Sequence, residues 1–245
     1  MSEEIEVKIM ELESLEYADY DTSKIPAMGK KLDTIFQYNE DIDQTAFLNW
    51  RTGFAHTSRR QFVIIGEAFF STAYNLVQQC IFDNRDKKAD SWIFPIMFNV
   101  VHGIEVYLKA INAALSFVLN KERSITDGGH DLKALYGTAR NLIIEYKSSN
   151  KCATTEEMFQ GIKVVGKFID NIYAKTDDMT FARYPLAKDK QGHFYIDTFE
   201  NEVIDLALLA EQIVYVYKML DFIYEMPELD LEIQAEAMAE MIGYY

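Results

Sequence analysis

Apolar residues recur through most of this chain at intervals of three and four, the pattern of helices that bury one face. The clearest stretches of this kind are residues 59–83, 91–121, 131–148, 154–175 and 198–225. Residues 28–50 are expected to add one or two short helices. Because only 11 Gly and 4 Pro interrupt the sequence, the chain is predicted to be all-α, an up-and-down bundle of about six helices around one core.

Residues 180–196 depart from the helical pattern. Two short β-prone runs, TFARY and HFYI, flank a loop that contains Pro185 and Gly192. Short runs of this composition around a loop are typical of a hairpin. We therefore expect a small β-hairpin inserted into the helical body.

Negative charge is concentrated at the two ends of the sequence. The net charge is −15, and residues 1–21 and 221–245 supply nearly all of it. An acidic chain argues against broad electrostatic binding of nucleic acid. The acidic ends are either solvated faces or arms that bind a basic protein partner. The expected domains are an N-terminal segment (1–58) that packs on the bundle, the bundle itself (59–225) and an acidic C-terminal helix or arm (226–245).

Cysteine and histidine usage argues against a metal site. Cys80 and Cys152 lie far apart without a CxxC pattern, and the four histidines lack the spacing of paired ligands. We therefore expect no metal and no cofactor. The first residues lack the basic and apolar regions of a signal peptide, and no apolar run reaches the roughly 18 residues of a membrane span. The chain is expected to be a soluble, cytoplasmic protein that does not contact a membrane.

The helix expected at residues 91–121 gathers its polar side chains on one side. These polar positions, three or four residues apart, are Asn99, His102, Glu105, Lys109, Asn112 and Ser116. At 100° per residue they form a stripe roughly 140° wide. The stripe either faces water, with Glu105 and Lys109 as an ordinary helical ion pair, or faces a cleft. In a cleft, Glu105 would orient His102 as a general acid or base.

Two further positions have side chains that suit phosphate chemistry. His130 follows Gly128-Gly129 and precedes Asp131, which is the expected N-cap of the next helix. A histidine beside helix N–H groups can contact a phosphate, and the alternative is a plain turn and cap. Arg183, in the FARYP run, is either a clamp for a phosphate or carboxylate or a structural arginine at a strand end.

Three sequence elements together resemble the HEPN superfamily. They are FPIMFNVVHGIEVYLKAI (94–111), GHDLKALY (129–136) and FARYP (181–185), and they occur in this order. In the longer bacterial, defence-associated branch of that family, a helix of the form FPI-x-F-x-x-x-H-x-x-E-x-x-L-K precedes a GHDL element and an F-R-Y-P element. The resemblance covers about residues 60–225. It implies an all-α bundle that usually dimerises, and in many members a metal-independent ribonuclease or toxin of bacterial or phage defence.

The chain departs from the active pattern of that family. Active HEPN sites have an arginine followed four to six residues later by a histidine, near the dimer interface. No arginine stands at that distance before His102, and the formal matches are Arg51 with His56 and Arg123 with His130. We predict that the catalytic groups are His102, Glu105, His130 and Arg183, gathered in one cleft. The predicted binding residues are Asn99, Lys109, Asp131 and Tyr184.

These residues leave three functions to compare. The first is a homodimeric ribonuclease or toxin that acts on RNA. The second is a non-catalytic HEPN-like dimerisation or binding module, suggested by the missing arginine. The third is a sensor of a nucleotide or another small molecule, which would bind in a cleft under Arg183.

Overall fold

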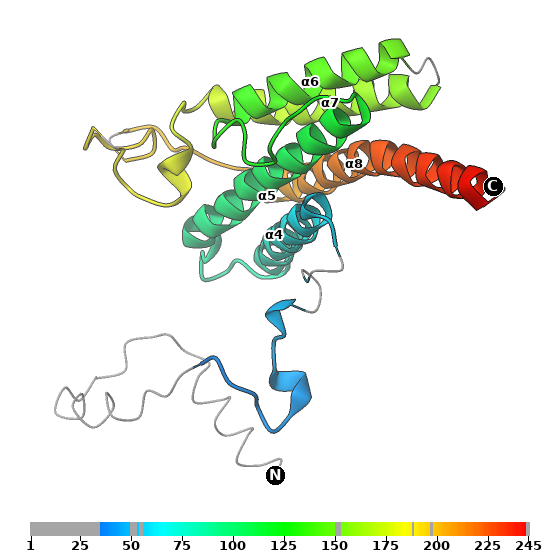
Figure 1. Ribbon diagram of the computed structural model, residues 1–245. Coiled ribbons are helices and arrows are strands. Elements are labelled where there is room, and N and C mark those ends of the chain that lie inside the picture. Colours follow the sequence, from blue (N-terminus) through cyan, green and yellow to red (C-terminus); the bar gives the residue numbers. More distant parts are fainter. Residues whose placement is uncertain are drawn as a thin grey trace. The chain divides into compact units, whose positions relative to one another are not determined.

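A computed structural model describes residues 35–49, 53, 56–149, 153–187, 189–196 and 198–243, and it divides the chain into two units, Met1–Ala46 and Phe47–Tyr245 (Figure 1). In the first unit, the described residues contain one short 3-10 helix, η2 (Ile42–Gln44). The Asp41 side chain caps it by accepting a hydrogen bond from the amide of Asp43. Much of the segment predicted for 1–58, including Arg51, lies outside the described residues.

The second unit is built from helices, which confirms the all-α fold class (Figure 1). Its long helices are α4 (Ser58–Phe82), α5 (Ala89–Val118), α6 (Leu132–Ser149), α7 (Ala153–Tyr173) and α8 (Leu206–Gly243). The described part of the chain thus contains five long helices, where the sequence predicted about six. Consecutive helices pack against each other, and α8 also packs against α4 and α5.

Capping side chains set several of the helix ends. Thr57 begins α4 by accepting a hydrogen bond from the amide of Arg60. Asn84 accepts one from the amide of Ala89, so α5 begins two residues before the predicted start. Asp205 accepts hydrogen bonds from the amides of Ala207 and Leu208, both at 3.0 Å. This cap explains why α8 begins at Leu206 and not near residue 198, as predicted.

The predicted hairpin is not formed in the described residues. The first β-prone run instead folds into a short 3-10 helix, η3 (Met179–Ala182), because the Asp178 side chain accepts a hydrogen bond from the amide of Thr180 and starts a turn there. What remains of a hairpin is one isolated antiparallel bridge between Leu186 and Gly192.

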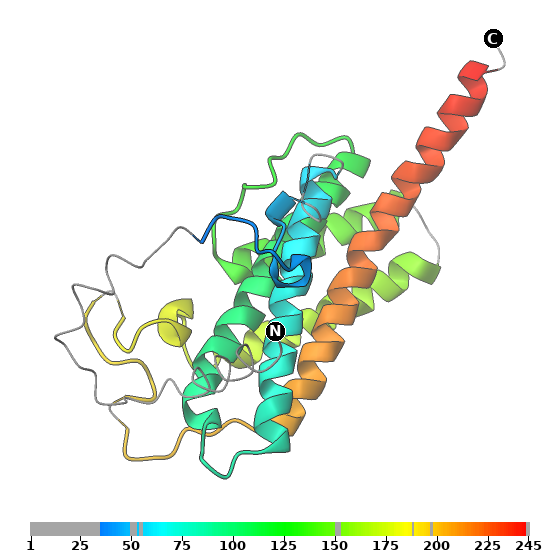
Figure 2. The ribbon, with the colours of Figure 1, turned by 90° about the horizontal axis from the view of Figure 1, so that it is seen from below.

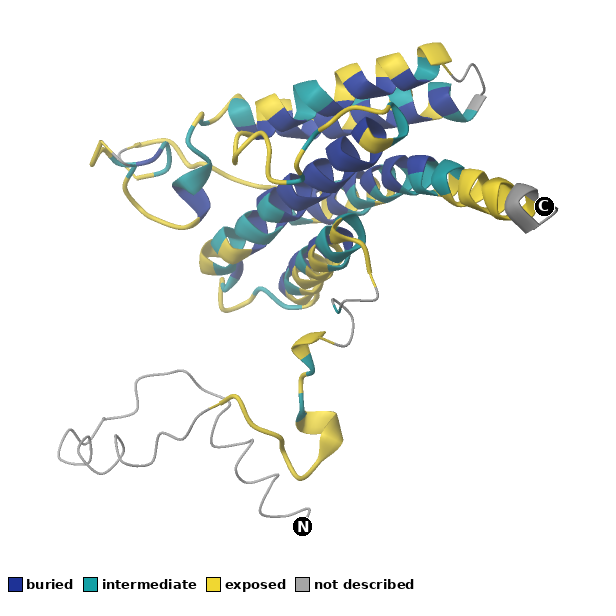
Figure 3. Ribbon diagram, in the orientation of Figure 1, coloured by how far each residue is buried: buried dark blue, intermediate teal, exposed yellow. Residues whose placement is uncertain are grey.

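Helix α5 is the centre of the bundle. Every residue from Gly103 to Ser116 is buried, on all sides of the helix (Figure 3). Gly66 of α4 allows close packing, because a β-carbon there would lie only 2.7 Å from Cδ2 of Tyr107. By length and composition α5 could cross a membrane, but more than half of its most apolar window is buried inside the protein, which is consistent with the core helix of a soluble protein.

Helix α8 closes the bundle against the beginning of α4. Arg59 pairs with Glu228, and Arg60 pairs with Glu225 at 2.7 Å. The helix continues through Pro227 to Gly243, so the segment predicted as an acidic helix or arm, 226–245, is helical and continuous with α8 as far as it is described. Figure 2 shows this end of α8 extending past the other helices of the unit, and residues 233–240 are exposed.

Candidate functional site

One buried carboxylate, that of Glu105, is shared by three basic side chains. Nζ of Lys109 donates to its Oε1 at 2.8 Å. Nδ1 of His130 lies 2.7 Å from the same oxygen. Nδ1 of His102 lies 3.6 Å from Oε2. We call these four residues the Glu105 cluster.

The Glu105 cluster keeps its carboxylate ionised. Burial alone would raise the pKa of Glu105, but the hydrogen bonds from His102, Lys109 and His130 outweigh burial and lower the pKa to about 2. An ionised carboxylate can only accept hydrogen bonds. Nδ1 of His130 must therefore carry a hydrogen, so its Nε2 is left to exchange protons.

Local sequence explains how these side chains meet. His102 and Lys109 are three residues before and four after Glu105, which places all three on one face of α5. His130 arrives from the loop before α6, where Gly128 and Gly129 adopt φ values of 98° and 62° that favour glycine.

Asp131 follows in the sequence as the predicted N-cap. Its Oδ1 accepts a hydrogen bond from the amide of Ala134 at 3.1 Å, which fixes the first turn of α6. His130 therefore lies between a turn formed by Gly128 and Gly129 and the capped first turn of α6.

Most of the polar stripe on α5 is buried, and two of its residues, Glu105 and Asn112, contact α6 or the loop before it. Glu105, Lys109, Asn112 and Ser116 are all buried, so the interpretation of the stripe as a water-facing surface is wrong for these four. The side-chain amide of Asn112 donates to the carbonyl of Leu135 at 3.1 Å, and its Oδ1 is buried without a partner. Helical spacing therefore predicted which residues form the stripe, but it did not predict that most of them are buried.

Two phenylalanines enclose His102. The ring of Phe69 meets it edge to face, with centroids 4.6 Å apart, and the ring of Phe98 stacks on it at 5.7 Å. Cζ of Arg183 lies 5.9 Å from the centroid of Phe98. Arg183 and His102 therefore contact one common ring, although they are 81 positions apart in the sequence. Sequence reasoning missed both phenylalanines, since they resemble ordinary core residues.

The remaining candidates have more ordinary surroundings. The side chain of Asn99 donates to the carbonyl of Pro95 at 2.8 Å, so it is satisfied within its own helix. Tyr184 is exposed, with the Arg183 guanidinium 5.8 Å from its ring. Lys109 is buried and its ammonium is paired with Glu105, so it does not present its charge to a large ligand. His193, which the sequence did not single out as a site residue, is buried, and its Nε2 has no hydrogen-bond partner among the described residues.

Neither metal-binding groups nor comparison with known proteins assigns a further function to these residues. Across the described ranges, no group of three or more His, Cys, Asp or Glu side chains is placed to hold a metal ion. Comparisons with protein-family models, with curated proteins and with solved structures found nothing that matches this chain. Two features bear on the function of the chain, the geometry of the Glu105 cluster and the resemblance of three sequence elements to the HEPN superfamily.

Proposed function

We propose that this chain is a HEPN-like, metal-independent endoribonuclease that acts in the cytoplasm in bacterial or phage defence. The observation that carries this proposal is the approach of two imidazoles to the one buried carboxylate of Glu105, with Nδ1 of His130 at 2.7 Å and Nδ1 of His102 at 3.6 Å from its oxygens. A carboxylate that accepts from Nδ1 fixes the tautomer and the direction of an imidazole, and leaves Nε2 for the substrate.

Cleavage of RNA by its own 2′-hydroxyl requires a base, an acid and a positive charge. The 2′-oxygen bonds to phosphorus while the bond from phosphorus to the 5′-oxygen breaks. One imidazole takes the proton of the 2′-hydroxyl, and the other gives a proton to the departing 5′-oxygen. The products are a 2′,3′-cyclic phosphate and a 5′-hydroxyl. Arg183, which contacts the same phenyl ring as His102, is the group we assign to the charge on phosphorus.

Exposure indicates the side from which RNA would approach. The side chain of His130 is 83% exposed, whereas that of His102 is 33% exposed. His130 is therefore open to a large substrate, whereas His102 is partly covered by Phe69 and Phe98. Because Lys109 is buried, its role in this proposal is to hold the carboxylate ionised rather than to bind RNA.

The proposal is tested with short single-stranded RNA in buffer with EDTA. Wild type is expected to release fragments that end in a 2′,3′-cyclic phosphate. His102→Ala and His130→Ala are each expected to lose at least about 100-fold in rate. Glu122→Gln, an exposed change in the same loop as His130, is the matched control and should retain full rate. Full activity in both histidine variants would remove the Glu105 cluster from the mechanism, and no cleavage by wild type would contradict the proposal as a whole.

A second function, a non-catalytic HEPN-like dimerisation module, is favoured by one face of α8. Leu208, Tyr215 and Leu229 lie at multiples of seven residues, and each is about half exposed. Apolar side chains that repeat every seven residues form a seam suited to a partner helix. Light scattering should then show a wild-type homodimer that Tyr215→Glu converts to a monomer. A wild type that is monomeric at all concentrations would contradict this alternative.

A further inference from the structure

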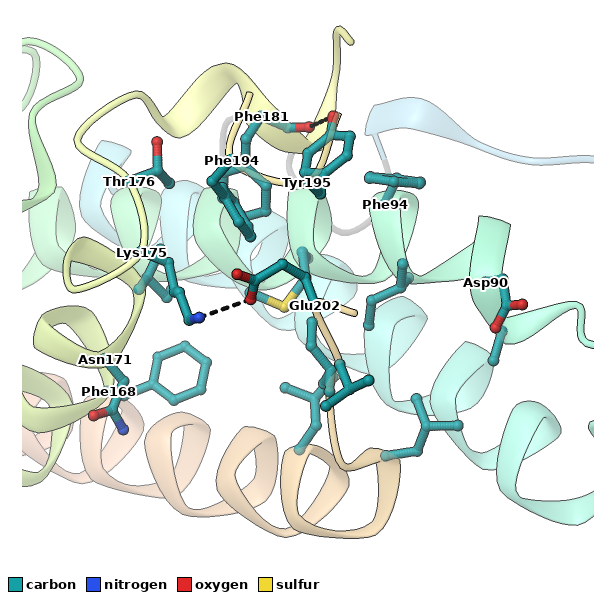
Figure 4. A pocket seen from close by; sticks show the side chains of 18 of the residues that line it. Asp90, Phe94, Phe168, Asn171, Lys175, Thr176, Phe181, Phe194, Tyr195 and Glu202 are labelled. Atoms are coloured by element: carbon teal, nitrogen blue, oxygen red, sulfur yellow. Dashed lines mark hydrogen bonds and ion pairs between the residues drawn. The ribbon is translucent and has the colours of Figure 1, made fainter. Parts of the chain in front are cut away.

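A pocket of about 530 Å³ lies between the beginning of α5, the end of α7, η3 and the segment that leads into α8 (Figure 4). None of its lining residues belongs to the Glu105 cluster. Its walls are aromatic, and the rings are those of Phe94, Phe168, Phe181, Phe194 and Tyr195. Its volume and apolar lining are those of sites that bind small molecules.

The aromatic wall is held in place without a ligand. The ring of Tyr195 lies 5.1 Å from that of Phe94 and 5.3 Å from that of Phe194, measured between centroids. The hydroxyl of Tyr195 donates to the carbonyl of Phe181 at 2.7 Å, which links this wall to η3. A ligand would therefore bind a preformed site, and little free energy would be lost in ordering its side chains.

The residues that line the pocket include more negative than positive side chains. Nζ of Lys175, two residues after the end of α7, donates to Oε2 of Glu202 at 2.7 Å, and Figure 4 shows this pair among the lining residues. Asp90 adds a second carboxylate. The lining therefore carries two negative charges and one positive charge.

The ammonium of Lys175 can also be replaced easily as the partner of Glu202. The side chain of Lys175 is 58% exposed, so its ammonium can turn into water at small cost, whereas that of Glu202 is 29% exposed. Once Lys175 turns away, the carboxylate of Glu202 remains beside a set of aromatic rings. Aromatic faces attract cations, and carboxylates do so more strongly.

We propose that this pocket binds an apolar small molecule with one cationic amine, whose ammonium replaces Lys175 as the partner of Glu202. The apolar body of the ligand packs among the five rings, and its positive charge lies beside the carboxylate of Glu202. An anionic ligand would find a single ammonium that is already paired with a carboxylate, in a chain of net charge −15. This inference does not rest on the ribonuclease proposal.

Three probes with one apolar body and different charges test the proposal. They are 2-naphthylmethylammonium, 2-naphthylmethanol and 2-naphthoate, titrated calorimetrically into the full chain at neutral pH. The ammonium is expected to bind tighter than the alcohol by roughly fivefold, the upper range for an ion pair with a partly exposed carboxylate such as that of Glu202, and the naphthoate weakest. Equal binding of all three, or tightest binding of the naphthoate, would overturn the assignment of a cation. No binding of any probe would overturn the site.

Two pairs of variants locate the binding. Glu202→Gln should remove the preference for the ammonium over the alcohol, whereas Glu200→Gln, two residues away and outside the pocket, should keep it. Val203 lines the pocket yet is largely exposed, so Val203→Trp should block the entrance without disturbing the core. Val164→Trp, on an exposed part of α7 outside the pocket, is its control. Unchanged probe binding in Glu202→Gln and Val203→Trp would contradict the proposal.

Discussion

Replacing Glu105 by glutamine should destabilise the protein strongly, although the two side chains have nearly the same shape. Lys109 is 8% exposed, and Glu105 is the partner of its ammonium in the cluster. Glu105→Gln leaves that positive charge buried beside a neutral amide. An ammonium that is removed from water without a compensating charge is costly, and this cost appears in the free energy of unfolding.

The pKa of Glu105 gives the size of the effect. It falls from 4.5 in an unfolded chain to about 2 in the folded protein, and each unit corresponds to about 1.4 kcal/mol. The ionised carboxylate therefore contributes roughly 3 kcal/mol to stability at neutral pH. This agrees with the loss of about 3–5 kcal/mol that follows when one partner of a buried ion pair is removed. Most single domains have only about 5–15 kcal/mol in total.

The measurement is urea unfolding of wild type, Glu105→Gln, Lys109→Met and the double variant, followed by circular dichroism. Since the double variant buries no unpaired charge, it should be clearly more stable than the sum of the two single losses predicts, by about 2 kcal/mol. A loss below about 1 kcal/mol in Glu105→Gln, or additive losses in the double variant, would contradict the account of a buried pair.

The same variants should show a characteristic pH dependence. A carboxyl whose pKa is lowered by folding stabilises the protein fully above its unfolded pKa of 4.5, and its contribution is lost as pH falls toward about 2. The difference in stability between wild type and Glu105→Gln should therefore be constant near neutral pH and shrink below pH 4.5. A difference in stability that grows on acidification would contradict the lowered pKa of Glu105 in the folded protein.

Two pairs of glycine substitutions test the backbone and the packing, each by its urea midpoint. Gly129→Ala should lose about 1 kcal/mol from its φ of 62°, and Gly128→Ala should lose more, because its β-carbon would also lie 2.8 Å from Leu135. An unchanged midpoint in Gly128→Ala would argue against the turn that delivers the histidine. Gly66→Ala should lose about 1–3 kcal/mol by overpacking α4 on α5, whereas Gly137→Ala, with open space around it, should gain about 0.5–1 kcal/mol. A stabilised Gly66→Ala would contradict the close approach of the two helices.

The sequence predicted the helices better than the connections between them. The apolar period located α5 to within three residues at each end, because a core helix must show a regular apolar pattern. It misread residues 180–196, where the side chain of Asp178 starts a 3-10 turn within a run of β-prone residues. It also missed the effect of Asp205, whose cap decides the first residue of α8. Local hydrogen bonds of this kind compete with propensity and leave a weak signal in a single sequence.

The candidate site was predictable only in part, for a similar reason. Helical spacing placed His102, Glu105 and Lys109 on one face, because this depends on α5 alone. That His130 makes the closer contact with Glu105, and His102 the longer one, depends on the path of the loop across α5. The contact of Arg183 with the ring of Phe98 depends on where η3 packs against α5. Contacts between distant segments of this kind cannot be read from periodicity.

The two charges at the centre of α5 also bear on how the chain is made. By length and composition α5 resembles a membrane span, and its apolar surface is uncovered in a nascent chain until α6, α7 and α8 have been synthesised. Glu105 and Lys109 lie near the middle of this helix, where each charged side chain adds about 2.5–3.5 kcal/mol to the cost of insertion into a bilayer. The pair therefore opposes capture of the growing chain by the membrane, and leaves burial within the bundle as the favourable outcome for this helix.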